Sequence, residues 1–177
     1  MPNTTLPVGS VEPFESLDNK ATSAARERRE SEIVITEWEQ ETRRLGRALA
    51  SMTLDLSAMT GSKWAHRFVI SVGPTAEDCV FLFYGASFAA RMELPVNPDY
   101  SAPVLAHLPV RYVPVFAKGC LDAMFQGAAV RMQGAVERRD GQHEFYRAAF
   151  IRLSIDPKRL QPLVLGAFSC RVAERQA

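Results

Sequence analysis

The feature that most constrains this chain is an Asp-Gly pair late in the sequence, with a strand-like run on each side of it. Val130–Arg138 and His143–Ile155 flank Asp140-Gly141, and this arrangement is a strong signal for a tight β-hairpin. A further apolar run, Pro162–Val172, follows after a short connection. Parallel neighbours would need long crossover connections, usually helical, between the strands. The last third of the chain therefore predicts consecutive antiparallel strands.

The hairpin also predicts a register. A two-residue turn places Val136 opposite Phe145 and gives one mainly apolar face. The same register sets Glu137 beside Glu144, which is unfavourable because like charges repel across a strand pair. We expect that pair to lie at a solvated rim, or a bulge to shift the register.

Shorter elements precede the hairpin. Arg67–Val72 alternates like a strand, and Cys79–Tyr84 is apolar on both parities, which predicts a strand covered on both faces. The residues that follow predict a short helix over Phe88–Glu93, an irregular proline-rich connection over Leu94–Pro109 and a longer helix over Val113–Gln126.

An apolar stripe lies N-terminal to all of these elements. Its members alternate at steps of three and four residues and include Ile35, Trp38, Leu45, Leu49, Met52 and Leu56. This spacing predicts an amphipathic helix over residues 32–61. It is also a heptad pattern, so the stripe either covers the protein's own sheet or pairs with a second copy; one helix could do both.

Composition limits the classes of protein that remain. The chain has 177 residues, 47% of them hydrophobic, and a net charge of +1. That length suits one domain, over residues 62–177, behind the helix and a flexible tail over residues 1–31. The near-neutral charge argues against a nucleic-acid-binding surface. With no apolar run of membrane-spanning length and no secretory signal at the N-terminus, we expect a cytoplasmic protein.

The cysteines and histidines predict no metal site. Cys79, Cys120 and Cys170 are far apart in the sequence, with no paired Cys or His spacing, so neither a zinc site nor a disulfide framework is expected. Buried, reduced thiols are the simpler interpretation.

The order of the elements resembles that of a PAS domain over roughly residues 64–173. Three segments also resemble stand-alone bacterial PAS-like proteins: "DCVFLFYGASFAARMELP", "LPVRYVPVFAKGCLDAMF" and "GAVERRDGQHEFYRAAFIRL". The resemblance implies an α+β fold with a five-stranded antiparallel sheet, helices inserted between its second and third strands, and a long amphipathic helix in front.

The resemblance also implies a function. PAS domains sense signals or regulate partners, so we expect a non-catalytic module, a homodimer and a separate signalling protein that receives the output. The implied cavity lies between the inner sheet face and the inserted helices. Its candidate lining residues are Phe68, Ile70, Tyr112, Phe116, Cys120, Met124 and Met132. For the four of these on the helix over Val113–Gln126 and just before it, a place in the core is the simpler interpretation.

No PAS cofactor is recognisable. The helix over Val113–Gln126 contains no His for haem, and Cys120 lacks the Asn-Cys-Arg-Phe run of the flavin photosensors. No pattern for a thiol-linked pigment is present either. The expected ligand is therefore an unidentified small apolar molecule.

Two sequence features suggest catalytic alternatives. Gly85-Ala86-Ser87-Phe88-Ala89 approaches a nucleophile elbow, but that motif needs a mostly parallel sheet, so Ser87 is predicted to cap the following helix. A small cone-shaped α+β enzyme, similar to the ketosteroid isomerases, would need a base in its pocket, and Asp122 is the nearest candidate. We expect no catalytic residue.

Overall fold

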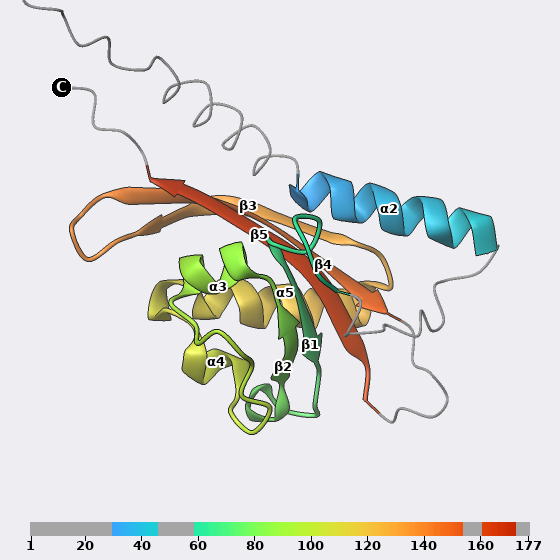
Figure 1. Cartoon of the computed structure of the whole chain (residues 1–177), viewed down its shortest axis with the longest axis horizontal. Helices are drawn as coiled ribbons and strands as arrows, with labels where there is room; N and C mark the ends of the chain where they lie inside the picture. The colour runs from blue at the N-terminus through green and yellow to red at the C-terminus, as the bar shows by residue number, and fades with distance from the viewer. Residues whose placement is uncertain (1–29, 46–58, 154–160, 173–177) are drawn as a thin grey trace, which may run out of the picture.

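Five strands form one antiparallel sheet in the order β2-β1-β5-β4-β3 (Figure 1). The structure is a computed structural model that describes residues 30–45, 59–153 and 161–172. Its elements are α2 (Glu30–Leu45), β1 (Arg67–Ser71), η2 (Ala76–Asp78), β2 (Val80–Tyr84), α3 (Ala86–Met92), α4 (Val104–His107), η3 (Val110–Tyr112), α5 (Val113–Gln126), β3 (Val130–Glu137), β4 (His143–Leu153) and β5 (Leu163–Val172). The predicted α+β fold is confirmed: α3 to α5 are inserted between the second and third strands, and a helix precedes the sheet.

The longest inserted helix, α5, has the bounds that the sequence predicts. A proline lies in its first turn, where the missing N–H costs no helical hydrogen bond. The helix ends at Gly127, whose φ of 62° lies in the left-handed region that glycine enters without strain.

The turn between β3 and β4 differs from the predicted two-residue turn. The amide of Arg138 donates to the carbonyl of Gln142 at 2.8 Å, and the amide of Gly141 donates to the carbonyl of Arg138 at 3.0 Å. Gly141 has a φ of +74°. These features match the three-residue hairpin loop in which a type I turn is followed by a left-handed glycine.

The longer loop shifts the register by one residue. Val136 pairs with Glu144 rather than with Phe145, and Glu137 pairs with His143. The predicted pairing of Glu137 with Glu144 is therefore wrong, and the alternative expectation, a bulge that shifts the register, is confirmed. Since neighbouring residues on a strand point to opposite faces, the shift also moves Glu144 to the inner face of the sheet.

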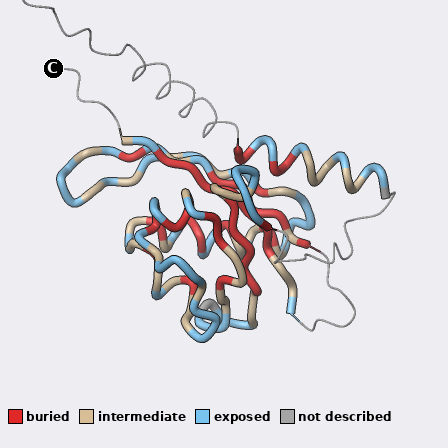
Figure 2. Tube along the Cα trace, in the orientation of Figure 1, coloured by how far each residue is buried: buried red, intermediate tan, exposed pale blue. Residues whose placement is uncertain are grey.

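The inner face carries a core of aromatic rings packed against α3 and α5. The ring centroid of Phe68 lies 5.0–6.3 Å from those of Phe81, Phe88, Phe116 and Phe150. Figure 2 shows buried residues concentrated where the strands face these helices. The centre of the predicted cavity is therefore filled by side chains.

The outer face of the sheet is covered by α2. Val34 and Ile35 are fully buried against Val69, Ile151 and Leu165 of the three central strands. All residues of β1 are buried, because the strand lies inside the sheet with side chains packed on both faces.

The start of α3 corrects the prediction for Ser87. The N-cap residue is Gly85, no side chain caps the helix, and Ser87 lies inside it. Gly85 is required by close packing, since a Cβ there would lie 1.9 Å from the carbonyl oxygen of Trp64. The all-antiparallel sheet also lacks the strand arrangement of a nucleophile elbow.

Candidate ligand groove

One side of α5 forms the wall of a groove of about 620 Å³. Phe116, Cys120 and Met124 line it at successive helical turns, and Leu121 and Phe125 stand next to them. Leu121 is 56% exposed and Phe125 is 82% exposed. Large apolar side chains that stay exposed around a concave site are typical of a binding surface.

The facing wall comes from the β1–β2 connection, α4 and the start of β5. It is lined by Val72, Gly73, Pro74, Thr75, Cys79, Val104, Leu105, Gln161 and Pro162. The amide of Val104 donates to the carbonyl of Cys79 at 2.7 Å, which ties α4 to the connection. The hydroxyl of Ser71 donates to Gln161 Oε1 at 2.7 Å, which ties the end of β1 to the start of β5. The wall is thus held by polar contacts while it presents mainly apolar surface.

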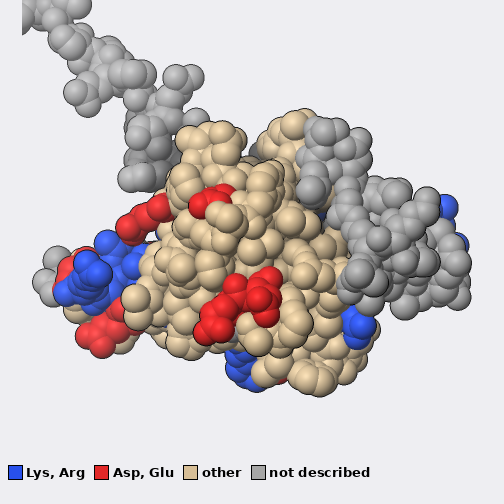
Figure 3. Space-filling view, turned by 90° about the horizontal axis from the view of Figure 1, so that it is seen from below, with Lys and Arg blue, Asp and Glu red and all other residues tan. Residues whose placement is uncertain are grey.

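Among the residues that the structure describes, no charged side chain lines the groove. Figure 3 shows that charged side chains are sparse on the face of the molecule seen from below, where acidic groups gather near the centre. A charged ligand in the groove would lose hydration without gaining a partner, which is costly. The groove therefore suits a small, uncharged, largely apolar molecule.

The groove contains two thiols, those of Cys79 and Cys120. Cys79 Sγ donates to the carbonyl of Thr75 at 3.4 Å. Burial, with a smaller contribution from Cys79, raises the pKa of the Cys120 thiol to about 12. Because the thiolate is the reactive form, Cys120 at neutral pH is an apolar contact rather than a nucleophile.

The structure brings together only part of the predicted pocket. Phe116, Cys120 and Met124 line the groove, whereas Phe68, Ile70 and Tyr112 are fully buried in the core and Met132 packs half-buried against it. The sequence analysis missed Leu121 and Phe125. The two residues have apolar i,i+4 spacing, but they lie off the stripe of Tyr112, Phe116, Cys120 and Met124 that predicts the core-facing side of the helix.

A buried polar cluster lies at the other end of α5. Glu144 is 3% exposed; it accepts hydrogen bonds from Arg111 Nε and from Cys170 Sγ, each at 3.2 Å. The buried hydroxyl of Tyr112 has no hydrogen-bond partner among the described residues. This cluster joins the start of α5 to β4 and β5.

The cluster keeps its carboxylate ionised. Burial opposes ionisation, but the hydrogen bonds from Cys170 and Arg111 and the positive charge of Arg111 hold the pKa of Glu144 below its ordinary value. Burial also raises the pKa of Tyr112 and raises that of Cys170 to about 12. At neutral pH, Tyr112 and Cys170 are therefore neutral, and the Arg111–Glu144 ion pair between them anchors the start of the helix.

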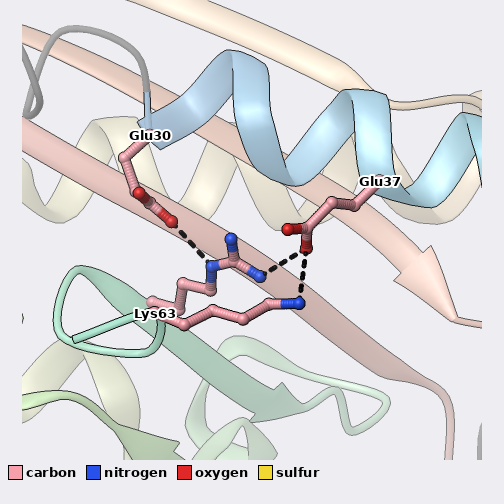
Figure 4. A network of polar contacts seen from close by, with 4 residues as sticks. Glu30, Glu37 and Lys63 are labelled. Atoms are coloured by element: carbon pink, nitrogen blue, oxygen red, sulfur yellow. Dashed lines mark hydrogen bonds and ion pairs between the residues drawn. The ribbon is translucent and has the colours of Figure 1, made fainter. Parts of the chain in front are cut away.

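On the outer face, a buried arginine holds α2 against the sheet (Figure 4). Arg67 is 2% exposed; its Nε donates to Glu30 at 2.7 Å and its Nη1 donates to Glu37 at 2.9 Å. Lys63 adds an ion pair to Glu37 at 3.2 Å, and the guanidinium lies 5.2 Å from the ring centroid of Trp64. Charge pairing therefore adds to the apolar contacts that dock α2.

The predicted dimerisation residues divide between two regions. Ile35 is fully buried on the protein's own sheet and Trp38 packs half-buried on it. Leu45 is the last residue of α2, whereas Leu49, Met52 and Leu56 lie outside the described residues. Within the predicted helix over 32–61, the structure is helical in α2, up to Leu45, and Met59 is not helical. The structure thus shows that α2 covers the sheet of its own chain, and pairing of the stripe between two copies stays a prediction.

The structure offers no support for the enzyme alternative. Asp122 lies on α5 outside the groove lining and pairs with Lys118 at 2.7 Å. Within the described ranges, no group of three or more His, Cys, Asp or Glu side chains is placed to hold a metal ion. In the same part of the chain, no helix combines the length and apolarity needed to span a bilayer.

The strand order, with helices inserted between β2 and β3, defines a PAS-like fold. No family model matches the chain, and no curated protein matches its sequence.

Solved structures of similar shape include three from this fold group. A fungal LOV-domain photoreceptor is 10% identical, with a TM-score of 0.42 over 74% of this chain and 88% of that chain. A PAS domain of a two-component sensor histidine kinase is 12% identical, with a TM-score of 0.39 over 60% of this chain and 86% of that chain. A PAS domain of an HTR-like protein from Haloarcula marismortui is 13% identical, with a TM-score of 0.37 over 75% and 99%. The assignment of the fold rests on the strand order itself.

Proposed function

We propose that this chain is a non-catalytic sensory or regulatory module that binds a small uncharged apolar molecule in the α5 groove. The observation that carries the proposal is a groove of about 620 Å³ whose described lining residues are all uncharged, edged by exposed Leu121 and Phe125. The proposed module is cytoplasmic and homodimeric, and it acts on a separate signalling protein without a membrane or nucleic-acid partner.

The packing supplies a route from the groove to α2. Phe116 lines the groove and its ring centroid lies 5.2 Å from that of Phe68. Arg67, the residue that precedes Phe68 on β1, forms ion pairs with Glu30 and Glu37 of α2. A ligand that displaces Phe116 would therefore act on the strand that carries the docking arginine, and a change in α2 docking is the proposed output.

Dye binding tests the groove. Nile red, a neutral apolar dye, should bind the full chain, and Leu121→Glu should weaken that binding at least about tenfold because a carboxylate would be desolvated in the groove. Val110→Glu is the matched control: Val110 is 82% exposed and does not line the groove, so its substitution should leave the affinity unchanged. Equal binding by all three proteins would contradict the assignment. Native mass spectrometry of the purified protein would then identify any molecule that it retains.

A further inference from the structure

Among the strands that the structure describes, β3 lies at the edge of the sheet and pairs on one side only, with β4. Because the Arg138 amide donates to the Gln142 carbonyl, Arg138 and Gln142 form a hydrogen-bonded pair of the β3–β4 ladder. From this pair the register between β3 and β4 continues without a bulge. Hydrogen-bonded pairs alternate along an antiparallel ladder. The residues whose backbone N–H and C=O groups face the open side are therefore Arg131, Gln133, Ala135 and Glu137.

This edge lacks the features that commonly prevent strand addition. Proteins block exposed edges with proline, bulges or very short strands, whereas β3 has eight residues, no proline and an unbroken register. Its charged residues, Arg131 and Glu137, have opposite signs and lie near opposite ends. Such an edge can accept another strand by β-augmentation.

The sequence of β3 complements itself in one register. When two copies run antiparallel about Gly134, Arg131 faces Glu137 and Gln133 faces Ala135. Both pairs join residues whose backbone groups point outward, so the hydrogen-bond ladder continues across the junction. On the inner face the same register sets Met132 opposite Val136, and both are half-buried at present.

We infer that a second copy of this chain pairs with β3 about a two-fold axis at Gly134 and extends the sheet across the dimer. A two-fold interface brings the same patch of both copies together, as this register requires. The inference deepens the homodimer part of the proposed function by naming its surface, and it does not depend on ligand binding in the groove.

Gly134, the residue on the two-fold axis, allows the two β3 strands to approach each other closely. Gly134 would face its own copy in a non-hydrogen-bonded pair, where the Cα atoms lie about 4.5 Å apart and side chains crowd. A Cβ at Gly134 would lie 3.0 Å from the hydroxyl of Tyr146 and 3.1 Å from its ring. The Tyr146 ring therefore already covers the inner side of Gly134, while the strand edge itself stays accessible.

Arg131 and Glu137, the charged residues near the two ends of β3, are both exposed. Among the described residues Glu137 has no ion-pair partner. Arg131 is exposed and reaches Glu32 and Glu39 of α2 only at 3.4 and 3.7 Å. A second copy would bring Glu137 to Arg131 twice, once on each side of the axis.

A charge-swap experiment on the full chain tests this register. Sedimentation velocity over a concentration series should show a wild-type dimer. Glu137→Arg and Arg131→Glu, each alone, should weaken dimerisation on the order of tenfold, because each places like charges opposite one another at both ends. An equimolar mixture should restore the dimer, since every cross-strand pair in the mixed dimer then joins opposite charges.

Two further variants separate the edge from general effects. Gln133→Pro removes an outward N–H without removing a bond to β4, and it should give a monomer. Glu77→Arg makes the same charge change as Glu137→Arg at an exposed site on η2, and it should leave the dimer intact. Circular dichroism and thermal melting of each variant verify that it is folded.

The outcomes are distinguishable. A wild-type monomer at every concentration would overturn this interface together with the proposed homodimer. Single variants that dimerise as tightly as the wild type would overturn the β3 interface alone and leave pairing through the N-terminal stripe. Single variants that are monomeric but fail to combine when mixed would overturn the register about Gly134.

Discussion

Arg67 and Phe68 are neighbours on β1, and their side chains pack on opposite faces of the sheet. The Arg67 guanidinium is buried against Glu30 and Glu37 of α2, and the Phe68 ring packs on Phe116 of α5 with centroids 5.2 Å apart. One peptide unit thus joins the contacts that dock the outer helix to those that hold the groove helix. Because both side chains are buried, we expect movement at one face to shift the contacts on the other.

Arg67→Met should destabilise the fold by about 3–5 kcal/mol, because it leaves Glu30 buried without its partner. Urea unfolding measures the loss. Arg44→Met is the control: Arg44 pairs with Glu41 at the surface, where solvent screens the pair, so its loss should change the stability little. Adding Glu30→Gln to Arg67→Met should recover part of the loss. Equal effects at Arg67 and Arg44 would show that the buried pair does not hold α2.

Glu144→Gln should destabilise the protein most at neutral pH. The folded-state pKa of Glu144 lies below its ordinary value of 4.5, so the ionised group stabilises the fold above that value. This contribution disappears as the pH falls through the folded-state pKa. Urea unfolding of wild type and variant at stepwise lower pH should therefore show the two stabilities converging, whereas Glu77→Gln, at an exposed site, should change little. A gap that stays constant with pH would contradict the ion pair with Arg111.

Cys120 should react slowly with iodoacetamide. With a pKa of about 12, its thiolate fraction at neutral pH is small, and the alkylation rate should rise about tenfold per pH unit. Peptide mass spectrometry after timed alkylation of the native protein measures the rate, and a short cysteine peptide is the reference. Saturation of the groove with Nile red should slow the reaction further. A rate at pH 7 equal to that of the peptide would show that Cys120 is not shielded.

Gly119→Ala should lower stability by about 1–2 kcal/mol. The added Cβ would lie 2.3 Å from the Phe150 ring, and such overpacking costs about 1–3 kcal/mol, partly offset by the better helix propensity of alanine. Combining it with Phe150→Leu should cost less than the sum of the two single changes, because the smaller side chain gives room. Additive losses in urea unfolding would show that α5 does not contact β4 at this point.

Ser87→Ala should change stability by less than about 0.5 kcal/mol, because Ser87 does not cap α3. Gly85→Ala should cost about 3 kcal/mol, since its Cβ would collide with the Trp64 carbonyl. Thermal or urea unfolding of both variants distinguishes the glycine from the serine. A loss near 1 kcal/mol for Ser87→Ala would restore the capping role that the sequence predicts.

Local patterns were sufficient to place most elements of this fold. The bounds of α5 follow from a proline in its first turn and a glycine after its last, and the strands around Asp140-Gly141 follow from apolar runs beside a turn signal. These signals work because backbone preferences act within a few residues of one another. The resemblance to PAS domains then supplied the sheet and the position of the inserted helices.

The candidate groove was only partly predictable. The stripe on α5 identifies Phe116, Cys120 and Met124, but it cannot show that the aromatic rings around Phe68 fill the space on the inner sheet face. Which surface stays open depends on how side chains from distant elements pack together. The contribution of Leu105 and Gln161 to the facing wall depends on that packing as well.

The sequence by itself determined that the chain makes an antiparallel sheet with a hairpin at Asp140-Gly141, because turn chemistry and apolar alternation are local. The tertiary structure decided the register. One left-handed glycine lengthened the turn by a residue, which moved Glu144 to the inner face and placed it beside Arg111. The tertiary structure also decided the burial of Arg67, since only the docking of α2 supplies the carboxylates that make a buried guanidinium stable.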